Sequence, residues 1–176
     1  MGRASQVVGA LFEAWIESQH DKALDLGILA HPATHNQAIT KVIGGRLIYE
    51  KPGIADYTGT LTRGAVTLAV EAKSTQLGYL PRLAITQKQQ MHLSAVAVAG
   101  GISLLLVEFR KDHINDRYAV PWTLVPWGVK RTAESVDEDA ITKWHIPPQT
   151  ECYLERFHTR GPAVERVVRK RIYPRE

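Results

Sequence analysis

Residues 56–75 read DYTGTLTRGAVTLAVEAKST, and this stretch predicts a β-hairpin. Its strands should cover 56–61 and 65–74, because two runs suited to β-structure flank a short turn that contains a glycine. Side chains alternate between the two faces of a strand. In the second strand one face is therefore apolar and is formed by Val66, Leu68, Val70 and Ala72. The opposite face carries two charged residues, Glu71 and Lys73.

This hairpin brings two carboxylates and a lysine together. Asp56 lies on the first strand and Glu71 on the second, so both carboxylates can come within reach of one metal ion. Lys73 shares the face of Glu71, about 6.6 Å further along the strand. Hard carboxylate oxygens favour Mg²⁺, and we expect Mn²⁺ to substitute. A metal ion that activates water, beside a lysine that stabilises developing charge, is suited to phosphodiester hydrolysis.

The Glu-x-Lys pattern by itself is only a weak indication of a site. Two such residues on an exposed strand face more often form a solvated ion pair, worth less than about 1 kcal/mol. The elements that follow favour the catalytic interpretation, because a helix and a buried strand come directly after the hairpin.

The sequence before the hairpin predicts a helix and a second hairpin. Apolar side chains recur at three- and four-residue spacings over 5–26, as in an amphipathic helix, and they include Val8, Leu11, Phe12, Trp15 and Ile16. Residues 39–49 contain Gly44-Gly45 between two β-rich runs, which is a strong signal for a tight turn between strands.

The sequence after the hairpin predicts a βαβ unit. A helix over 86–99 should open with a capping box formed by Thr86 and Gln89. Residues 102–109 form a nearly continuous apolar run, as expected of a strand buried on both faces. Strand 65–74 and this strand should be parallel, with a right-handed crossover through the helix. The fold class is therefore α/β, with a mixed central sheet flanked by helices.

At these residues the chain resembles the PD-(D/E)XK nuclease superfamily, whose restriction-endonuclease-like core has the order αβββαβ. Within that superfamily it resembles Holliday junction resolvases of the RecU and archaeal Hjc types. The resemblance covers about residues 5 to 110. The segments that carry it are Gly9-Ala-Leu-Phe-Glu13, Asp56-Tyr-Thr-Gly59, Glu71-Ala-Lys73-Ser-Thr75, and Gln89 with Met91-His92.

The resemblance implies a metal-dependent homodimer that resolves four-way DNA junctions by paired symmetric nicks. It implies Asp56 and Glu71 as metal ligands, Lys73 beside the attacking water, and Glu13 as a further acidic member of the catalytic site. It also implies that the segment before Asp56 is a projecting stalk that enters the junction. In this chain that segment is the hairpin near 39–51, with the basic residues Lys41, Arg46 and Lys51 as expected DNA contacts.

Two of these site assignments have a purely structural alternative. Gln89 could belong to the catalytic site, or it could only complete the capping box with Thr86. Glu13 could approach the site from the first helix, or it could be an ordinary surface carboxylate near Glu17.

The positive charge of the chain is concentrated at its C-terminal end. The net charge of the 176 residues is +4, whereas residues 156–176 alone contain seven basic and two acidic side chains, a net charge of +5. Basic tails of this kind often contact nucleic acid, although a solvated surface helix would have the same composition. We expect DNA contacts from Arg166, Arg169, Lys170 and Arg171.

Composition and spacing exclude several other classes. Hydrophobic residues make up 44% and charged residues 23%, which excludes a disordered chain. A single cysteine, Cys152, excludes a disulfide framework and a four-cysteine zinc site. His31 and His35 lie four residues apart, but Pro32 between them prevents a helical pair of zinc ligands.

We expect one nuclease domain over 1–150 and a basic extension of the same domain over 151–176. The pattern is weaker after the βαβ unit, where an edge strand is expected at 118–121 and a short helix at 136–144. The longest apolar run is too short to cross a bilayer and no signal peptide is readable, so we expect a cytoplasmic protein of a bacterium or a phage-infected host cell. The competing functions are another DNA nuclease of the same core, restriction-type or directed at single strands, and a DNA-binding module without catalysis.

Overall fold

A computed structural model describes residues 3–35, 39–43, 46–50, 55–111, 114–130 and 133–158. The α-helices in this part of the chain are α1 (Arg3–Asp25), α2 (Gln87–Val98) and α3 (Glu155–His158). The strands are β1 (Thr34–His35), β2 (Ile39–Ile43), β3 (Arg46–Glu50), β4 (Tyr57–Leu61), β5 (Val66–Thr75), β6 (Tyr79–Pro81), β7 (Ile102–Lys111), β8 (Ile114–Pro121), β9 (Gly128–Lys130) and β10 (Ala133–Asp137).

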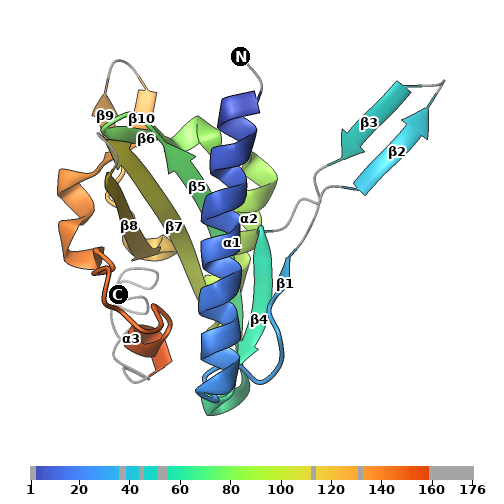
Figure 1. The fold of residues 1–176 in the computed structure, drawn as a ribbon, viewed down its shortest axis with the longest axis vertical. Coiled ribbons are helices and arrows are strands. Elements are labelled where there is room, and N and C mark those ends of the chain that lie inside the picture. Colours follow the sequence, from blue (N-terminus) through green and yellow to red (C-terminus); the bar gives the residue numbers. More distant parts are fainter. Residues whose placement is uncertain are drawn as a thin grey trace, which may run out of the picture.

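The centre of the fold is a five-stranded mixed sheet in the order β1-β4-β5-β7-β8. Strands β4 and β5 form the predicted antiparallel hairpin, and β5 and β7 are parallel and connected through α2. Figure 1 shows α1 lying along one face of this sheet and α2 behind it. Counting only the strands of the central sheet, the chain order is α1, β1, β4, β5, α2 and β7. The predicted αβββαβ order and the mixed sheet between helices are therefore confirmed.

The sheet is buried on both faces, and alternate residues of β5 belong to two separate cores. Leu68 and Val70 pack into the cluster that includes Phe12 and Ile16 of α1. Ala69 packs instead into the cluster on the α2 side of the sheet. The predicted alternation of faces is correct, but the charged face of β5 is covered by α2 and is not exposed to solvent. This covering determines the environment of Glu71 and Lys73.

The ends of α1 and α2 follow the local sequence. Gly27 adopts φ +67, and the N–H of Ile28 donates to the Ala23 carbonyl at 2.8 Å, which is a glycine-terminated helix end. Helix α2 opens with the predicted capping box of Thr86 and Gln89. It ends just before Gly100 and Gly101, and Gly100 adopts φ +84. A Cβ atom at Gly101 would lie 2.9 Å from the Thr67 carbonyl oxygen of β5, so glycine permits α2 to return closely onto the sheet.

Three predictions from the sequence differ from the structure: a helix at 136–144, the apolar face of the first helix at Leu11, and the start of the edge strand. The segment 136–144 is not a single helix, because Val136 is fully buried in β10 and a 3₁₀-helix follows at Asp139–Trp144. Strand β10 pairs with β6 and β9 in a separate small sheet, and this long-range pairing overrides the local pattern. Leu11 of the expected apolar face is 66% exposed. The edge strand β8 begins earlier than expected and ends at Pro121, where a missing N–H is tolerated.

The chain after residue 150 returns to the core. Tyr153, Leu154 and Phe157 are buried in the cluster that contains α1, and Cys152 is buried with them. The basic residues predicted beyond position 158 lie outside the described residues, as do Gly44, Gly45 and Lys51 of the first hairpin. Within the part of the chain that is described, no helix is long and apolar enough to span a membrane.

Candidate active site

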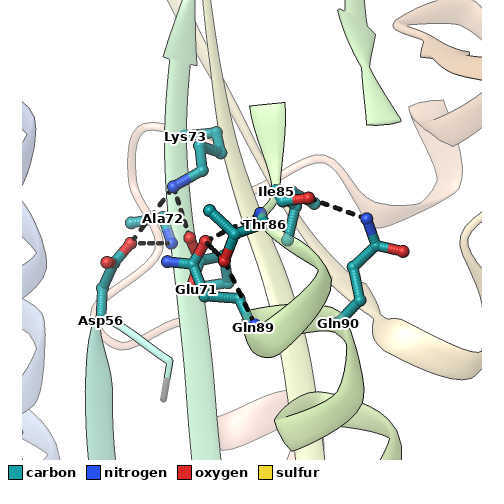
Figure 2. A network of polar contacts seen from close by, with 8 residues as sticks. All are labelled: Asp56, Glu71, Ala72, Lys73, Ile85, Thr86, Gln89 and Gln90. Carbon is teal, nitrogen blue, oxygen red and sulfur yellow. Dashed lines mark hydrogen bonds and ion pairs between the residues drawn. The ribbon is translucent and has the colours of Figure 1, made fainter. Parts of the chain in front are cut away.

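The pairing of β4 with β5 places the two predicted metal ligands beside each other. Tyr57 is opposite Val70, so the preceding residue, Asp56, is next to Glu71 at the start of β4. One carboxylate oxygen of Asp56, Oδ2, accepts a hydrogen bond from the backbone N–H of Ala72 at 3.0 Å. Figure 2 shows this bond crossing from one strand to the other. Asp56 is therefore held by the strand that carries the rest of the site.

Lys73 bridges the two carboxylates. Its ammonium forms an ion pair and a hydrogen bond with Oε1 of Glu71. The same Nζ atom lies 3.7 Å from Oδ2 of Asp56. The Lys73 side chain is only 16% exposed, so these interactions are less screened than those of a surface ion pair. The solvated-pair interpretation of Glu-x-Lys does not apply to this chain.

Glu71 is a buried carboxylate with spare coordination capacity. It is 0% exposed, and its second oxygen, Oε2, has no hydrogen-bond partner among the described residues. Burial raises the pKa of Glu71 to about 7, and the neighbouring charge of Asp56 adds to this effect, whereas Lys73 opposes it. An unpaired buried carboxylate oxygen is costly unless something binds it.

Gln89 closes the site from the first turn of α2. Its side chain is buried, and its Oε1 accepts hydrogen bonds from the backbone N–H of Thr86 at 3.0 Å and from the Thr86 hydroxyl at 2.9 Å. In the view of Figure 2 the Gln89 amide is drawn towards Glu71. The capping role is confirmed, and the role of Gln89 in the catalytic site stays a prediction. The spacing of Thr86 and Gln89 predicted the cap, but it gave no indication that Thr86 lies near the candidate site.

Glu13 lies on α1 and is exposed to solvent. Its charge acts on the buried Tyr57 hydroxyl: burial, and then Glu13, Glu17 and Asp56, raise the pKa of Tyr57. Within the described residues, no hydrogen bond or ion pair joins Glu13 to Asp56, Glu71 or Lys73. Its catalytic role therefore stays a prediction.

The expected DNA contacts are only partly within the described residues. Lys41 lies on β2 and Arg46 on β3, in the hairpin that extends away from the central sheet in Figure 1. These two strands pair with each other over the full predicted hairpin, from Ile39 opposite Glu50 to Ile43 opposite Arg46. The remaining candidates are outside the described residues: Lys51, Arg166, Arg169, Lys170 and Arg171.

The residues present fit a hard divalent metal ion. Among the residues that the structure describes, Oε2 of Glu71 has no hydrogen-bond partner, and the Asp56 carboxylate is beside Glu71 just before the adjacent strand β4. No group of three or more His, Cys, Asp or Glu side chains with metal-binding geometry occurs among the described residues. Mg²⁺ is commonly held by one or two carboxylates and completes its shell with water and substrate phosphate, so a two-carboxylate site suits it better than it suits Ca²⁺ or Zn²⁺.

Together, the β4–β5 hairpin, the Asp and Glu-x-Lys side chains and the parallel β5-α2-β7 unit define a nuclease of the PD-(D/E)XK class. The model of one family, Recombination protein U (RecU), matches residues 32–150, which is more than half of the chain. The chain belongs to the RecU family, a family of Holliday junction resolvases, which bind branched DNA and typically act as dimers.

One of the solved structures that the chain resembles is Hjc from Archaeoglobus fulgidus, a Holliday junction resolvase from an archaeal hyperthermophile. The sequence identity is 13% and the TM-score is 0.41, with 70% of this chain and 88% of that chain covered. No curated protein matches the sequence.

Proposed function

We propose that this chain is a Mg²⁺-dependent endonuclease that resolves four-way DNA junctions by paired symmetric nicks, with Asp56 and Glu71 as metal ligands. The observation that carries the proposal is the convergence of Asp56, Glu71 and Lys73 on one covered face of the β4–β5 hairpin. Membership of the RecU family supports the substrate class. Mn²⁺ should replace Mg²⁺, because both ions favour carboxylate and water ligands.

Each of the three side chains has a distinct task. Asp56 is oriented by its bond to the Ala72 N–H, and Glu71 contributes the oxygen that lacks a partner. A divalent ion held by these carboxylates would lower the pKa of bound water and neutralise charge on the scissile phosphate. The ammonium of Lys73 faces both carboxylates, and it would hold the attacking water and stabilise developing negative charge.

Two other residues support this centre in the proposal. Gln89 fixes the first turn of α2 through Thr86 and would limit the movement of Glu71 from the helix side. Glu13 adds negative charge from α1, which would strengthen the attraction of a divalent cation to the site. Neither residue is required to hold the metal ion directly.

DNA recognition in the proposal depends on two basic segments of the sequence. The β2–β3 hairpin, with Lys41 and Arg46, would enter the junction as a stalk, and residues 159–176 would contact phosphates. A dimer with two-fold symmetry matches the symmetry of a four-way junction and brings two active sites to opposed strands. We place this activity in the cytoplasm of a bacterium or of a phage-infected cell.

The test compares a synthetic four-way junction, a linear duplex and a single strand, each with and without Mg²⁺. Wild-type protein should nick the junction in Mg²⁺ and leave the other substrates largely intact. Asp56→Asn should abolish cleavage but retain junction binding, because the amide keeps the shape and loses the metal-binding charge. Asp25→Asn, at an exposed carboxylate at the end of α1, is the matched control and should cut normally.

Each competing function has its own outcome in this experiment. Equal cleavage of the linear duplex would indicate a restriction-type nuclease, and cleavage of the single strand would indicate a single-strand-directed enzyme. Junction binding without cleavage in Mg²⁺ or Mn²⁺ would indicate a binding module. Full activity of Asp56→Asn would show that the assigned site is wrong.

A further inference from the structure

The β2–β3 hairpin joins the central sheet next to the active site. The chain enters the hairpin at Ile39, four residues after His35, the last residue of β1, and it returns from the hairpin to Asp56, which directly precedes β4. Strands β1 and β4 pair with each other, with His35 opposite Tyr57. Both connections of the hairpin therefore lead to one edge of the sheet, and one of them leads directly to a proposed metal ligand.

The β1–β4 pairing is short at the end of this edge that lies next to Asp56. Strand β1 has two residues, and the pairing consists of Thr34 with Thr58 and His35 with Tyr57. Further backbone hydrogen bonds join the two segments at the far end, where Leu29 is opposite Leu61. A two-residue ladder adds little stability without side-chain packing, and the side chain of His35 adds packing at the end next to Asp56.

His35 contacts both a strand and a helix. Its ring stacks on the ring of Tyr57, with centroids 4.5 Å apart and an angle of 17° between the planes. Its Nδ1 atom lies 3.4 Å from Oε1 of Glu17 on α1. His35 is thus held between the helix and the residue that follows Asp56, at the point where the hairpin begins.

Tyr57 has little freedom to move independently of its neighbours. It is 1% exposed, and on α1 the ring of His20 meets it edge-on at 5.2 Å between centroids. Because Tyr57 is covalently joined to Asp56, a shift of its ring or backbone changes the position of the Asp56 carboxylate. Sub-ångström misplacement of a catalytic group is enough to reduce a rate strongly.

We propose that His35 is a positioning residue that couples the β2–β3 hairpin to Asp56 through its stack on Tyr57. When the hairpin engages branched DNA, His35 transmits the resulting constraint to Tyr57 and holds Asp56 in register with Glu71. This inference rests on the proposed nuclease function. It assigns His35 no contact with metal or substrate.

The test measures single-turnover cleavage of a four-way junction at saturating protein, together with the Mg²⁺ concentration that gives half the maximal rate. His35→Ala should slow cleavage by about 10- to 100-fold. It should also raise the half-saturating Mg²⁺ concentration, because Asp56 is less well placed. Junction affinity in EDTA should stay within about twofold of wild type.

Two variants separate positioning from general stability. His35→Phe keeps an aromatic face on Tyr57 and should recover most of the rate, whereas His35→Leu fills space without stacking and should not. His31→Ala is the matched control, because His31 is exposed and its described side-chain contact is with the neighbouring Pro32 carbonyl. The comparison of His35→Phe with His35→Leu tests the positioning role of His35 even if His35→Ala does not fold.

The inference is wrong if the alanine and leucine variants keep the wild-type rate and Mg²⁺ requirement, or if the phenylalanine variant is as slow as the leucine variant. A loss of junction binding with an unchanged rate at saturation would also overturn it. In each of these cases wild-type protein still cuts the junction, so the proposed function stands. Failure of wild-type protein to cut would instead refute the function itself.

Discussion

The Asp56 carboxylate accepts a hydrogen bond from the backbone N–H of Ala72, at 3.0 Å. Ala72 lies between Glu71 and Lys73 on β5, so the strand that carries two members of the site also orients the third. The arrangement depends on the pairing of β4 with β5. Preorganised charges of this kind need little rearrangement during a reaction, which is a main source of catalytic power.

Lys73 should be needed for cleavage but not for folding or for junction binding. Lys73→Ala removes the ammonium that faces both carboxylates and should lower single-turnover cleavage by about 100-fold or more, as when a charge-stabilising donor is lost. Excess Mg²⁺ should not restore the rate, because the metal ion occupies a different position. Lys88→Ala, at an exposed lysine on α2, is the control. A fully active Lys73→Ala protein would reduce Lys73 to a structural ion pair.

Glu71 should destabilise the metal-free protein at neutral and alkaline pH. Its pKa is raised from 4.5 to about 7 in the folded state, so the folded protein binds this proton more tightly than the unfolded chain does. The contribution of Glu71 to stability is therefore highest below pH 4.5 and falls as the pH rises to about 7. At pH 8 the ionisation of Glu71 therefore lowers the free energy of unfolding by an amount on the order of 2–3 kcal/mol.

Glu71→Gln should remove that destabilisation and leave Lys73 paired with Asp56. Without divalent metal at pH 8, we expect the variant to melt at least about 4 °C above wild type, with a much smaller difference at pH 5. Thermal unfolding at the two pH values in EDTA measures this. Glu151→Gln, at an exposed position, should change little at either pH. If Glu71→Gln is less stable than wild type at pH 8, then the ionisation of Glu71 does not lower the free energy of unfolding as predicted.

Gln89 and Thr86 form one capping box, so two single variants can separate capping from a role at the site. Thr86→Ala and Gln89→Ala should each cost about 1 kcal/mol of stability through the loss of the cap. Only Gln89→Ala should also slow cleavage, because its amide points towards Glu71 in Figure 2. Unfolding curves and single-turnover rates measured together decide this. Equal rates in the two variants would make Gln89 a capping residue only.

The β2–β3 hairpin should provide the preference for junctions over linear duplex. Replacing residues 40–50 with a short turn should weaken junction binding much more than duplex binding, because a projecting element contacts only a branched substrate. Lys41→Ala with Arg46→Ala in the intact hairpin tests charge without changing shape. Binding titrations with both substrates give the answer, and an equal loss on both would indicate misfolding or general electrostatics.

The basic tail should provide a large part of the salt-dependent affinity. Phe157 is the last buried residue that the structure describes, so a truncation that removes 160–176 leaves every described core residue in place. If about three of the removed cations neutralise phosphates, the slope of log K against log salt should become less negative by roughly three. Cleavage at saturating protein should change much less. An unchanged slope in the folded truncated protein would make the tail structural.

The sequence predicted the elements that depend on near neighbours along the chain. A period of two in β5 was enough to place Glu71 and Lys73 on one face, and a Thr-x-x-Gln pattern was enough to predict the cap of α2. The segment 136–144 and Leu11 of α1 show the limit of this reasoning. Both predictions were wrong, because pairing and burial depend on which distant strand or helix lies opposite, as Val136 in β10 demonstrates.

The sequence by itself therefore determined the candidate site residues and their local order. Asp56 comes before one strand, Glu71 and Lys73 lie on the next, and a helix and a buried strand follow. Only the tertiary structure decided the bond from Asp56 to Ala72, the covering of Glu71 that raises its pKa, and the stack of His35 on Tyr57. The reason is physical. Alternation and capping arise from backbone geometry over a few residues, whereas register, burial and long-range stacking depend on how the packed elements meet.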